Sequence, residues 1–213
     1  MMSRWISLTL AAAVVAGLAV VVPTAYARKT IETPSYTVES EQAGFEVRRY
    51  APRIVAEVVV EGDADQATNA GFRILADFIF GNNRAKTEIA MTAPVDRSAE
   101  PIAMTAPVDR SAEGDAWVVA FTMPSKYTLD TLPEPNDARV KIRQLPSKTY
   151  AVLRFSGAPS ERKVQRKIDE FVQTIEAAGL ARSGAAPTYA RYDPPWTLGF
   201  LRRNEIFVEL ALD

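Results

Sequence analysis

The 213-residue chain contains no cysteine and no histidine. Without cysteine there can be no disulfide, so packing and hydrogen bonds alone must hold the fold together. The lack of histidine excludes a Ser-His or Cys-His nucleophile pair, and it excludes any metal centre with an imidazole ligand. These two absences remove the commonest designs of hydrolases and zinc proteins.

Charge of one sign is not in excess, because 25 Lys and Arg stand against 26 Asp and Glu, giving a formal net charge of −1. A near-neutral chain has no general electrostatic attraction for nucleic acid. The sequence also lacks the GxGxxG and Walker phosphate-binding loops and the GxSxG nucleophile motif. We therefore expect no nucleic acid as a partner and none of these common catalytic sites.

One long apolar run is present, over residues 5–22, after Arg4 and before Pro23. The following Ala25-Tyr26-Ala27 fits the small-x-small cleavage rule, so we interpret residues 1–27 as a signal peptide cleaved after Ala27. The alternative is an uncleaved membrane anchor, because the run approaches the length of a membrane span. We expect export to the periplasm or beyond, a linker at 28–34, one domain at 35–213 and no membrane span after cleavage.

Hydrophobic periodicity predicts the main elements of this domain. Apolar residues three and four apart predict helices over residues 63–80 and 160–178, with Ser160 as one N-cap and Gly81 and Gly179 after the C-terminal ends. Alternating and β-branched residues predict strands at 36–41, 45–50, 54–60, 117–123, 140–145, 150–155, 188–192 and 205–212. This order predicts an α+β fold, in which two pseudo-repeated βαββ-like halves form a distorted antiparallel barrel or sheet flanked by two helices.

A tandem repeat interrupts the pattern, because residues 89–100 and 102–113 both read IAMTAPVDRSAE. In each copy a short apolar segment is followed by a polar tail. The period of 13 residues is odd, so a single continuous strand would place the two copies on opposite faces. We therefore expect a turn between the copies, at residues 98–101.

Several strings in this order resemble the SOUL/haem-binding-protein family over residues 31–212. They are GFRILADFIFGNN at 71–83, IAMTAPV, WVVAFTMP at 117–124, FSG at 155–157, YDPPW at 192–196 and RRNE at 202–205. The resemblance implies a distorted β-barrel with two helices. It also implies a binding protein rather than an enzyme, with non-covalent binding of haem or another tetrapyrrole. Because the chain has no histidine, such binding would proceed without a histidine ligand to iron.

The resemblance also implies a site along the first helix. There Arg73 could pair with a propionate and Phe80 could stack on the ring, because guanidinium groups suit carboxylates. The alternative is a solvated arginine and a phenylalanine packed at the helix end. Met91 and Met104, one in each repeat, could line the pocket or ligate iron weakly, since thioethers are polarizable. Alternatively they are ordinary core or hairpin residues of a duplicated segment.

A second group of candidates follows the stiff Asp193-Pro-Pro segment. Trp196, Leu198 and Phe200 put large apolar groups on this loop, where they could close over a flat ligand. The alternative is that Trp196 is a buried plug in the core. We expect Arg202 and Arg203 to form structural ion pairs, with Glu205 or Asp193 as partners.

The sequence thus predicts an exported carrier or scavenger that binds haem or a similar flat amphipathic small molecule in an apolar cleft. Two alternatives stay open. One is a binding module for another hydrophobic small molecule or a lipid. The other is a protein-interaction domain without a small ligand.

Overall fold

The computed structural model describes residues 31–42, 44–85 and 101–211. The elements below all belong to one compact unit, Thr33–Asp213. Its two α-helices are α2 (Ala64–Ile79) and α3 (Glu161–Ala177). The strands are β1 (Tyr36–Gln42), β2 (Phe45–Tyr50), β3 (Arg53–Glu61), β4 (Asn83–Arg84), β5 (Val108–Glu113), β6 (Ala116–Thr122), β7 (Glu134–Pro135), β8 (Lys141–Leu145), β9 (Lys148–Ser156), β10 (Thr188–Arg191) and β11 (Arg203–Glu209).

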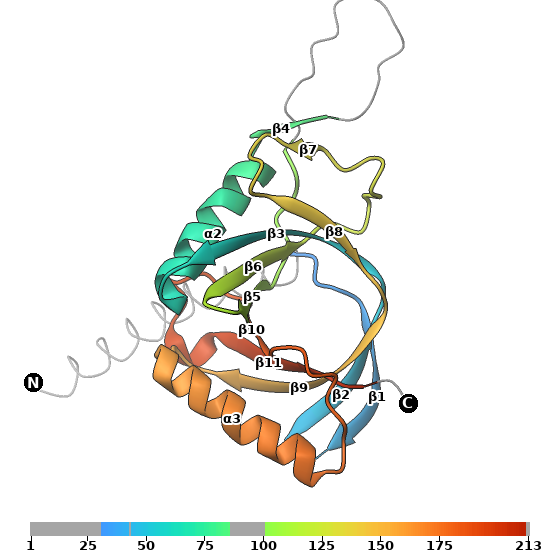
Figure 1. Ribbon diagram of the computed structural model, residues 1–213, viewed down its shortest axis with the longest axis vertical. Coiled ribbons are helices and arrows are strands. Elements are labelled where there is room, and N and C mark those ends of the chain that lie inside the picture. Colours follow the sequence, from blue (N-terminus) through green and yellow to red (C-terminus); the bar gives the residue numbers. More distant parts are fainter. Residues whose placement is uncertain (1–30, 43, 86–100, 212–213) are drawn as a thin grey trace, which may run out of the picture. The chain divides into compact units, whose positions relative to one another are not determined.

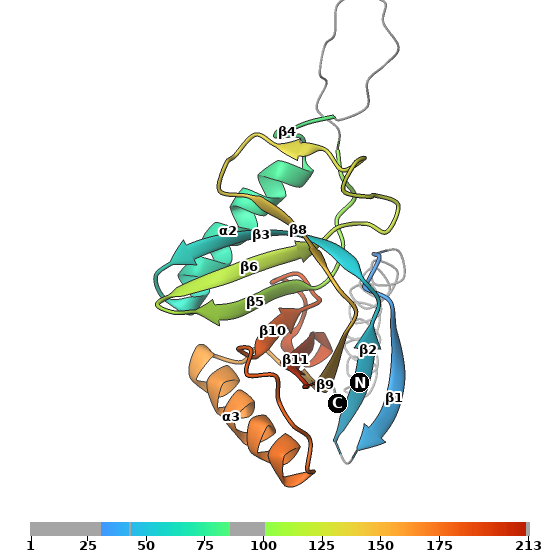
Figure 2. The ribbon, with the colours of Figure 1, turned by 45° about the vertical axis from the view of Figure 1, so that its right-hand side comes forward.

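Nine of these strands form one curled sheet in the order β1-β2-β9-β11-β10-β5-β6-β3-β8. Every neighbouring pair is antiparallel. The sheet bends into a half-barrel, and α2 and α3 lie against its outer face (Figures 1 and 2). The predicted α+β fold, a distorted antiparallel barrel with two helices, is confirmed.

The two predicted halves are β2-β3-α2-β5-β6 and β8-β9-α3-β10-β11. In the sheet, the first half contributes neighbouring strands β3, β6 and β5, and the second contributes β10, β11 and β9. The two halves meet where β5 pairs with β10. The first strand of each half pairs with the other half, since β2 lies beside β9 and β8 lies beside β3. The halves therefore exchange strands, and neither half has a complete sheet of its own.

Each helix covers one half of the outer face with a separate apolar cluster. Leu75, Phe78 and Ile79 of α2 pack on β3 and β6, while Val164, Phe171 and Ile175 of α3 pack on β9 and β11. Side chains alternate along a strand, so these contacts leave the other side of every strand for the concave face. At Gly71, α2 lies so close to β6 that an added Cβ would be 2.7 Å from the Cβ of Val119.

The helix ends follow the predicted chemistry at the two glycines, and only in part at the N-caps. Asp63 is the N-cap of α2, and its carboxylate accepts from the backbone N–H groups of Asp65 and Gln66 at 3.2 and 3.0 Å. Ser160 occupies the N-cap position of α3, but its side chain makes no capping hydrogen bond. Gly81 and Gly179 follow the helices with φ of +125° and +75°, a region that glycine enters without steric cost.

The interpretation of the repeat needs a correction. The tail of its second copy, expected to be merely polar, is strand β5, which pairs with β6 on one side and β10 on the other. Gly114, with φ of +58°, and Asp115 make the two-residue turn that joins Glu113 to Ala116, as tight hairpins require. Only the second copy precedes this Gly-Asp pair. The first copy, with Met91, and most of the expected turn at 98–101 lie outside the described residues.

Candidate functional site

The concave face of the half-barrel carries a cluster of aromatic rings. Tyr50, Tyr150 and Phe207 come from β2, β9 and β11, three strands that are neighbours in the sheet. Their ring centroids lie 5.7 to 5.9 Å apart and the rings meet edge to face, the arrangement that aromatic quadrupoles favour. The cluster forms an aromatic surface on the concave side of the sheet.

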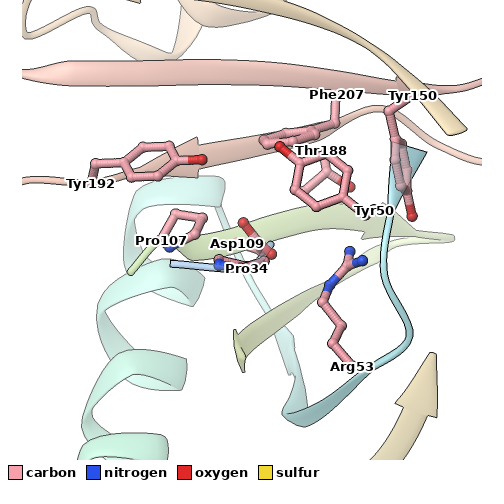
Figure 3. A pocket seen from close by; sticks show the side chains of 9 residues that line it. All are labelled: Pro34, Tyr50, Arg53, Pro107, Asp109, Tyr150, Thr188, Tyr192 and Phe207. Atoms are coloured by element: carbon pink, nitrogen blue, oxygen red, sulfur yellow. The ribbon is translucent and has the colours of Figure 1, made fainter. Parts of the chain in front are cut away.

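A cavity of about 340 Å³, which includes space open to solvent, lies against this cluster (Figure 3). It is lined by Pro34, Tyr50, Arg53, Pro107, Asp109, Tyr150, Thr188, Tyr192 and Phe207. Because that volume includes space open to solvent, the enclosed space is much smaller, and the cavity suits a small ligand or one end of a larger ligand.

Two charged side chains line this cavity and have atoms without a hydrogen-bond partner. The Nε and Nη1 atoms of Arg53 and the Oδ1 atom of Asp109 are buried and make no hydrogen bond. The guanidinium carbon of Arg53 lies 5.3 and 5.9 Å from the ring centroids of Tyr50 and Tyr150. Buried polar groups are usually satisfied, so three open positions at one cavity indicate a place for a polar ligand group.

Burial raises the pKa of Asp109 to about 7, against the field of Arg53, which lowers it, while the charge of Glu205 raises it further. The carboxyl therefore exchanges its proton near neutral pH, unlike an ordinary aspartate. Below that pH it can donate a hydrogen bond, and above it the group only accepts.

Beside the aromatic cluster, Glu205 is the centre of a buried charge network. The Glu205 side chain is 0% exposed, and its Oε1 accepts from Nη2 of Arg203 at 2.8 Å. Its Oε2 accepts from Nη1 of Arg48 at 3.2 Å and from the Tyr192 hydroxyl at 2.6 Å. Burial and the charge of Glu205 raise the pKa of Tyr192, so its phenol stays protonated. Both carboxylate oxygens are thus occupied by the protein itself.

The structure places the candidates of the β10–β11 connection in solvent. Trp196, Leu198 and Phe200 are 82%, 47% and 72% exposed. The alternative of a buried Trp196 plug is therefore wrong, because the connection leaves the sheet and runs past the start of α3. Gly199 of its 3₁₀ turn (Gly199–Leu201) lies close to Ala158.

Arginines fix the shape of this connection. The Arg202 guanidinium donates to the backbone carbonyls of Thr197, at 2.7 Å, and Pro195. The backbone N–H of Arg203 donates to the Asp193 carboxylate at 2.6 Å. The expected ion pair of Arg203 with Glu205 is confirmed, whereas Arg202 serves the loop backbone.

The candidates on α2 form a different group. Arg73 is exposed and Phe80, the C-cap residue, is 65% exposed. This end of the helix is held beside β4 and β7, where the N–H of Asn136 donates to the carbonyl of Asn82 at 3.2 Å (Figure 1). The α2 candidates and the β10–β11 connection therefore belong to different parts of the fold.

Of the two candidate methionines, only Met104 lies among the described residues, and it is 40% exposed. It precedes Thr105, whose buried hydroxyl donates to the carbonyl of Thr122. Met104 is thus a surface residue next to an anchored segment. Within the described ranges, no group of three or more Asp or Glu side chains could hold a metal ion. No helix in that part of the chain is long and apolar enough to cross a membrane.

Sequence reasoning missed the residues of the cavity. Tyr50 ends one predicted strand and Arg53 lies just before the next, but nothing local shows that both face the concave side. Asp109 lies in the repeat tail, which was described only as polar and was not predicted to be a strand. A signal was available in the alternation of β5, where Val108, Arg110 and Ala112 leave Asp109 and Ser111 on the opposite face.

Comparisons with known proteins agree with this architecture. The family model described as SOUL heme-binding protein matches residues 31–209. Heme-binding protein 2 of Homo sapiens is 29% identical over 188 residues, which cover 85% of this chain and 87% of that protein. Its Mus musculus counterpart is 26% identical over 185 residues, covering 84% and 86%.

Two solved structures are similar in fold alone. The EcmrR C-terminal domain matches with a TM-score of 0.57 at 10% identity, covering 84% of this chain and 99% of that chain. A hydrolase from Listeria innocua matches with a TM-score of 0.53 at 11% identity, covering 81% and 94%. At such identities the likeness extends to the curled sheet and its helices and carries no function with it.

Proposed function

Because this chain belongs to the SOUL heme-binding protein family, we propose that it binds haem or a related tetrapyrrole non-covalently, as a binding protein rather than an enzyme. The family is a haem-binding one, and two relatives named for haem binding align with most of the chain.

One observation carries the choice of site. Trp196 and Phe200 lie on one connection and are both mostly exposed. Exposed apolar side chains that gather in one place often mark a binding surface. The prolines before Trp196 and the hydrogen bonds of Arg202 stiffen the loop, so little ordering entropy is lost when a flat ring covers it.

The free energy expected from burial of this apolar surface is adequate for reversible binding. Covering two aromatic side chains and the matching ligand face removes on the order of 600 Å² of apolar surface. At about 25 cal/mol/Å² this contributes about 15 kcal/mol before binding costs of roughly 4–15 kcal/mol. The balance is consistent with a dissociation constant around the micromolar range, which corresponds to about 8 kcal/mol.

The residues present fit the ring of the ligand better than they fit its iron. The chain has no histidine or cysteine to ligate iron. The Tyr192 hydroxyl is bonded to Glu205 and stays protonated. Met104 is exposed and could supply only a weak thioether ligand. We therefore propose that apolar contact dominates and that iron ligation is secondary.

The lack of a strong iron ligand supports a role in transient carriage or scavenging. The apolar run at residues 5–22 and Ala25-Tyr26-Ala27 support export, so we propose that the carrier works in the periplasm or outside the cell. Without a strong iron ligand, the bound molecule can be released, as a carrier requires.

The test is a spectroscopic titration of residues 28–213 with ferric haem and with metal-free protoporphyrin. We expect saturable one-to-one binding of both, with dissociation constants within about threefold of each other. Trp196→Ala should weaken both by at least about tenfold, since it removes the largest exposed contact. Failure of both ligands to saturate would sink the proposal.

Phe80→Ala is the matched control, because Phe80 is also an exposed aromatic residue but lies on α2. We expect it to leave binding unchanged. A loss with Phe80→Ala but not with Trp196→Ala would move the site to α2. Binding of haem without binding of the metal-free ring would contradict the ring-contact mode, and Met104→Leu would then test the iron ligand.

A further inference from the structure

We propose that the cavity on the concave face is a second binding site, for a small planar carboxylate, with Arg53 as the partner of the anion and Asp109 as a second polar contact. This inference goes beyond tetrapyrrole binding, because it concerns other residues and a smaller ligand. It rests on the cavity, its aromatic walls and its unpaired polar atoms.

Arg53 has two buried hydrogen-bond donors that no protein group satisfies. A guanidinium with two buried nitrogen atoms and no hydrogen-bond partner is costly to keep away from water. The nearby rings of Tyr50 and Tyr150 attract its positive charge through their π faces, but they accept no strong hydrogen bond from its N–H groups. A carboxylate is the partner that suits a planar guanidinium best, because several N–H donors can meet its oxygens.

The walls of the cavity select a flat ligand. Tyr50, Tyr150 and Phe207 present rings to it, and Pro34 and Pro107 add apolar surface on the side of β5 (Figure 3). A ligand with an aromatic or conjugated body fills such a space with ring contacts worth about 0.5–1.5 kcal/mol each beyond area burial. Its carboxylate end would then meet Arg53.

Asp109 adds a dependence on pH. Arg53 on β3 and Glu205 on β11 act on it electrostatically, and the cavity also holds the hydroxyls of Tyr50, Tyr150 and Tyr192. Its strand neighbours Arg110 and Arg191 are engaged elsewhere, with Glu161 and Asp65. When protonated, Asp109 can donate to a carboxylate, and when ionised it repels one. Affinity for an anion should therefore fall as the pH rises through about 7.

An organic cation is the less favoured occupant. The buried carboxylate nearby, Glu205, already accepts from Arg48, Arg203 and Tyr192. Asp109 would be the remaining anionic partner, and only at higher pH. A cation would also have to approach the unpaired charge of Arg53. The two ligand classes thus make opposite predictions for pH dependence.

The experiment compares benzoate with benzylamine, two probes of similar size and opposite charge, by calorimetric titration at about pH 5.5 and about pH 8.5. Both probes keep their charge at these values. We expect benzoate to bind saturably and at least about tenfold more tightly at the lower pH, and benzylamine not to bind. Tighter binding of benzylamine, or no saturable binding of benzoate, would overturn the proposal.

Variants locate the site. Arg53→Gln should weaken benzoate at least about tenfold, and Asp109→Asn should retain binding but remove its pH dependence, since an amide can donate at any pH. Arg143→Gln is the control, because Arg143 lies on β8, is 60% exposed and pairs with Glu57. If Arg53→Gln fails to fold, the pH profile of Asp109→Asn still decides. An unchanged pH profile in Asp109→Asn, or equal losses in Arg53→Gln and Arg143→Gln, would contradict the assignment.

A competition experiment separates this inference from the proposed function. Saturating benzoate should leave the affinity for metal-free protoporphyrin unchanged if the two sites are different. Displacement of protoporphyrin by benzoate would overturn the second site and place the tetrapyrrole in the cavity. Loss of protoporphyrin binding in Trp196→Ala with retained benzoate binding would support both proposals together.

Discussion

Glu205→Gln should destabilise the fold more than any other single glutamate-to-glutamine change in the described sheet. The wild-type carboxylate is completely buried between Arg203, at 2.8 Å, and Arg48, at 3.2 Å. Glutamine would keep one oxygen as an acceptor. Its NH₂ group would face other hydrogen-bond donors and could not accept from them. Arg48, only 2% exposed, would then lose its buried countercharge and keep only the partly exposed Glu46, at 2.6 Å.

The expected magnitude follows from that burial. Removing one partner of a buried ion pair costs about 3–5 kcal/mol, because the remaining charge stays desolvated. A domain of about 150–250 residues loses roughly 2–4 °C of Tm for each kcal/mol. We therefore expect Tm to fall by about 6–20 °C, with a matching shift of the urea midpoint.

Urea unfolding at about pH 7, followed by far-ultraviolet circular dichroism, measures the effect. The control is Glu176→Gln, which breaks the Arg182–Glu176 pair at 2.9 Å, where the glutamate is 54% exposed. Exposed pairs contribute about 0–1 kcal/mol, so the control should stay near wild type. If Glu205→Gln cost no more than the control, the network would not hold the concave face together and the argument from burial would be refuted.

Three further predictions concern packing, pH and the exposed loop. Gly71→Ala should lower the free energy of unfolding by about 1–2 kcal/mol despite the better helix propensity of alanine, since its Cβ would lie 2.7 Å from Val119. In a double-mutant cycle measured by urea unfolding, Val119→Ala should relieve part of this loss. Asp109 has its pKa raised to about 7, so the folded state binds the extra proton and stability should fall as the pH rises from about 4 to about 7. Asp109→Asn should flatten that profile and raise stability near pH 8 by on the order of 1–3 kcal/mol, and a profile that stays as steep as wild type would contradict the raised pKa. Trp196→Ala should change the free energy of unfolding by no more than about 0.5 kcal/mol, because the side chain is mostly in solvent, and a larger loss would mean that Trp196 packs in the core.

Local signals predicted most elements of the fold. Asp63 and Gly81 bracket α2 as capping chemistry requires, and the strands from β1 to β3 appear within a residue or two of their expected bounds. These signals are local because caps, turns and apolar periodicity act over a few residues. The same signals supplied the order of elements from which the two halves were predicted.

Strand β5 shows where local reading fails. Val108–Glu113 has little apolar content, and its conformation depends on hydrogen bonds to β6 and β10. Such a strand is stabilised by its neighbours rather than by its own propensity. The same segment carries Asp109, so the failure to predict the strand was also a failure to predict the cavity.

The sequence alone thus determined the fold class, the family resemblance and the absence of any histidine or cysteine chemistry. It also pointed to an apolar segment around Trp196, although not to its exposure. Tertiary structure decided which side chains face the concave surface. The reason is distance along the chain: Arg48 and Glu205 are bonded across 157 residues, and Arg53, Asp109 and Phe207 come from three different strands. Only the curl of the sheet brings such groups together, and only burial there leaves atoms of Arg53 and Asp109 without a hydrogen bond.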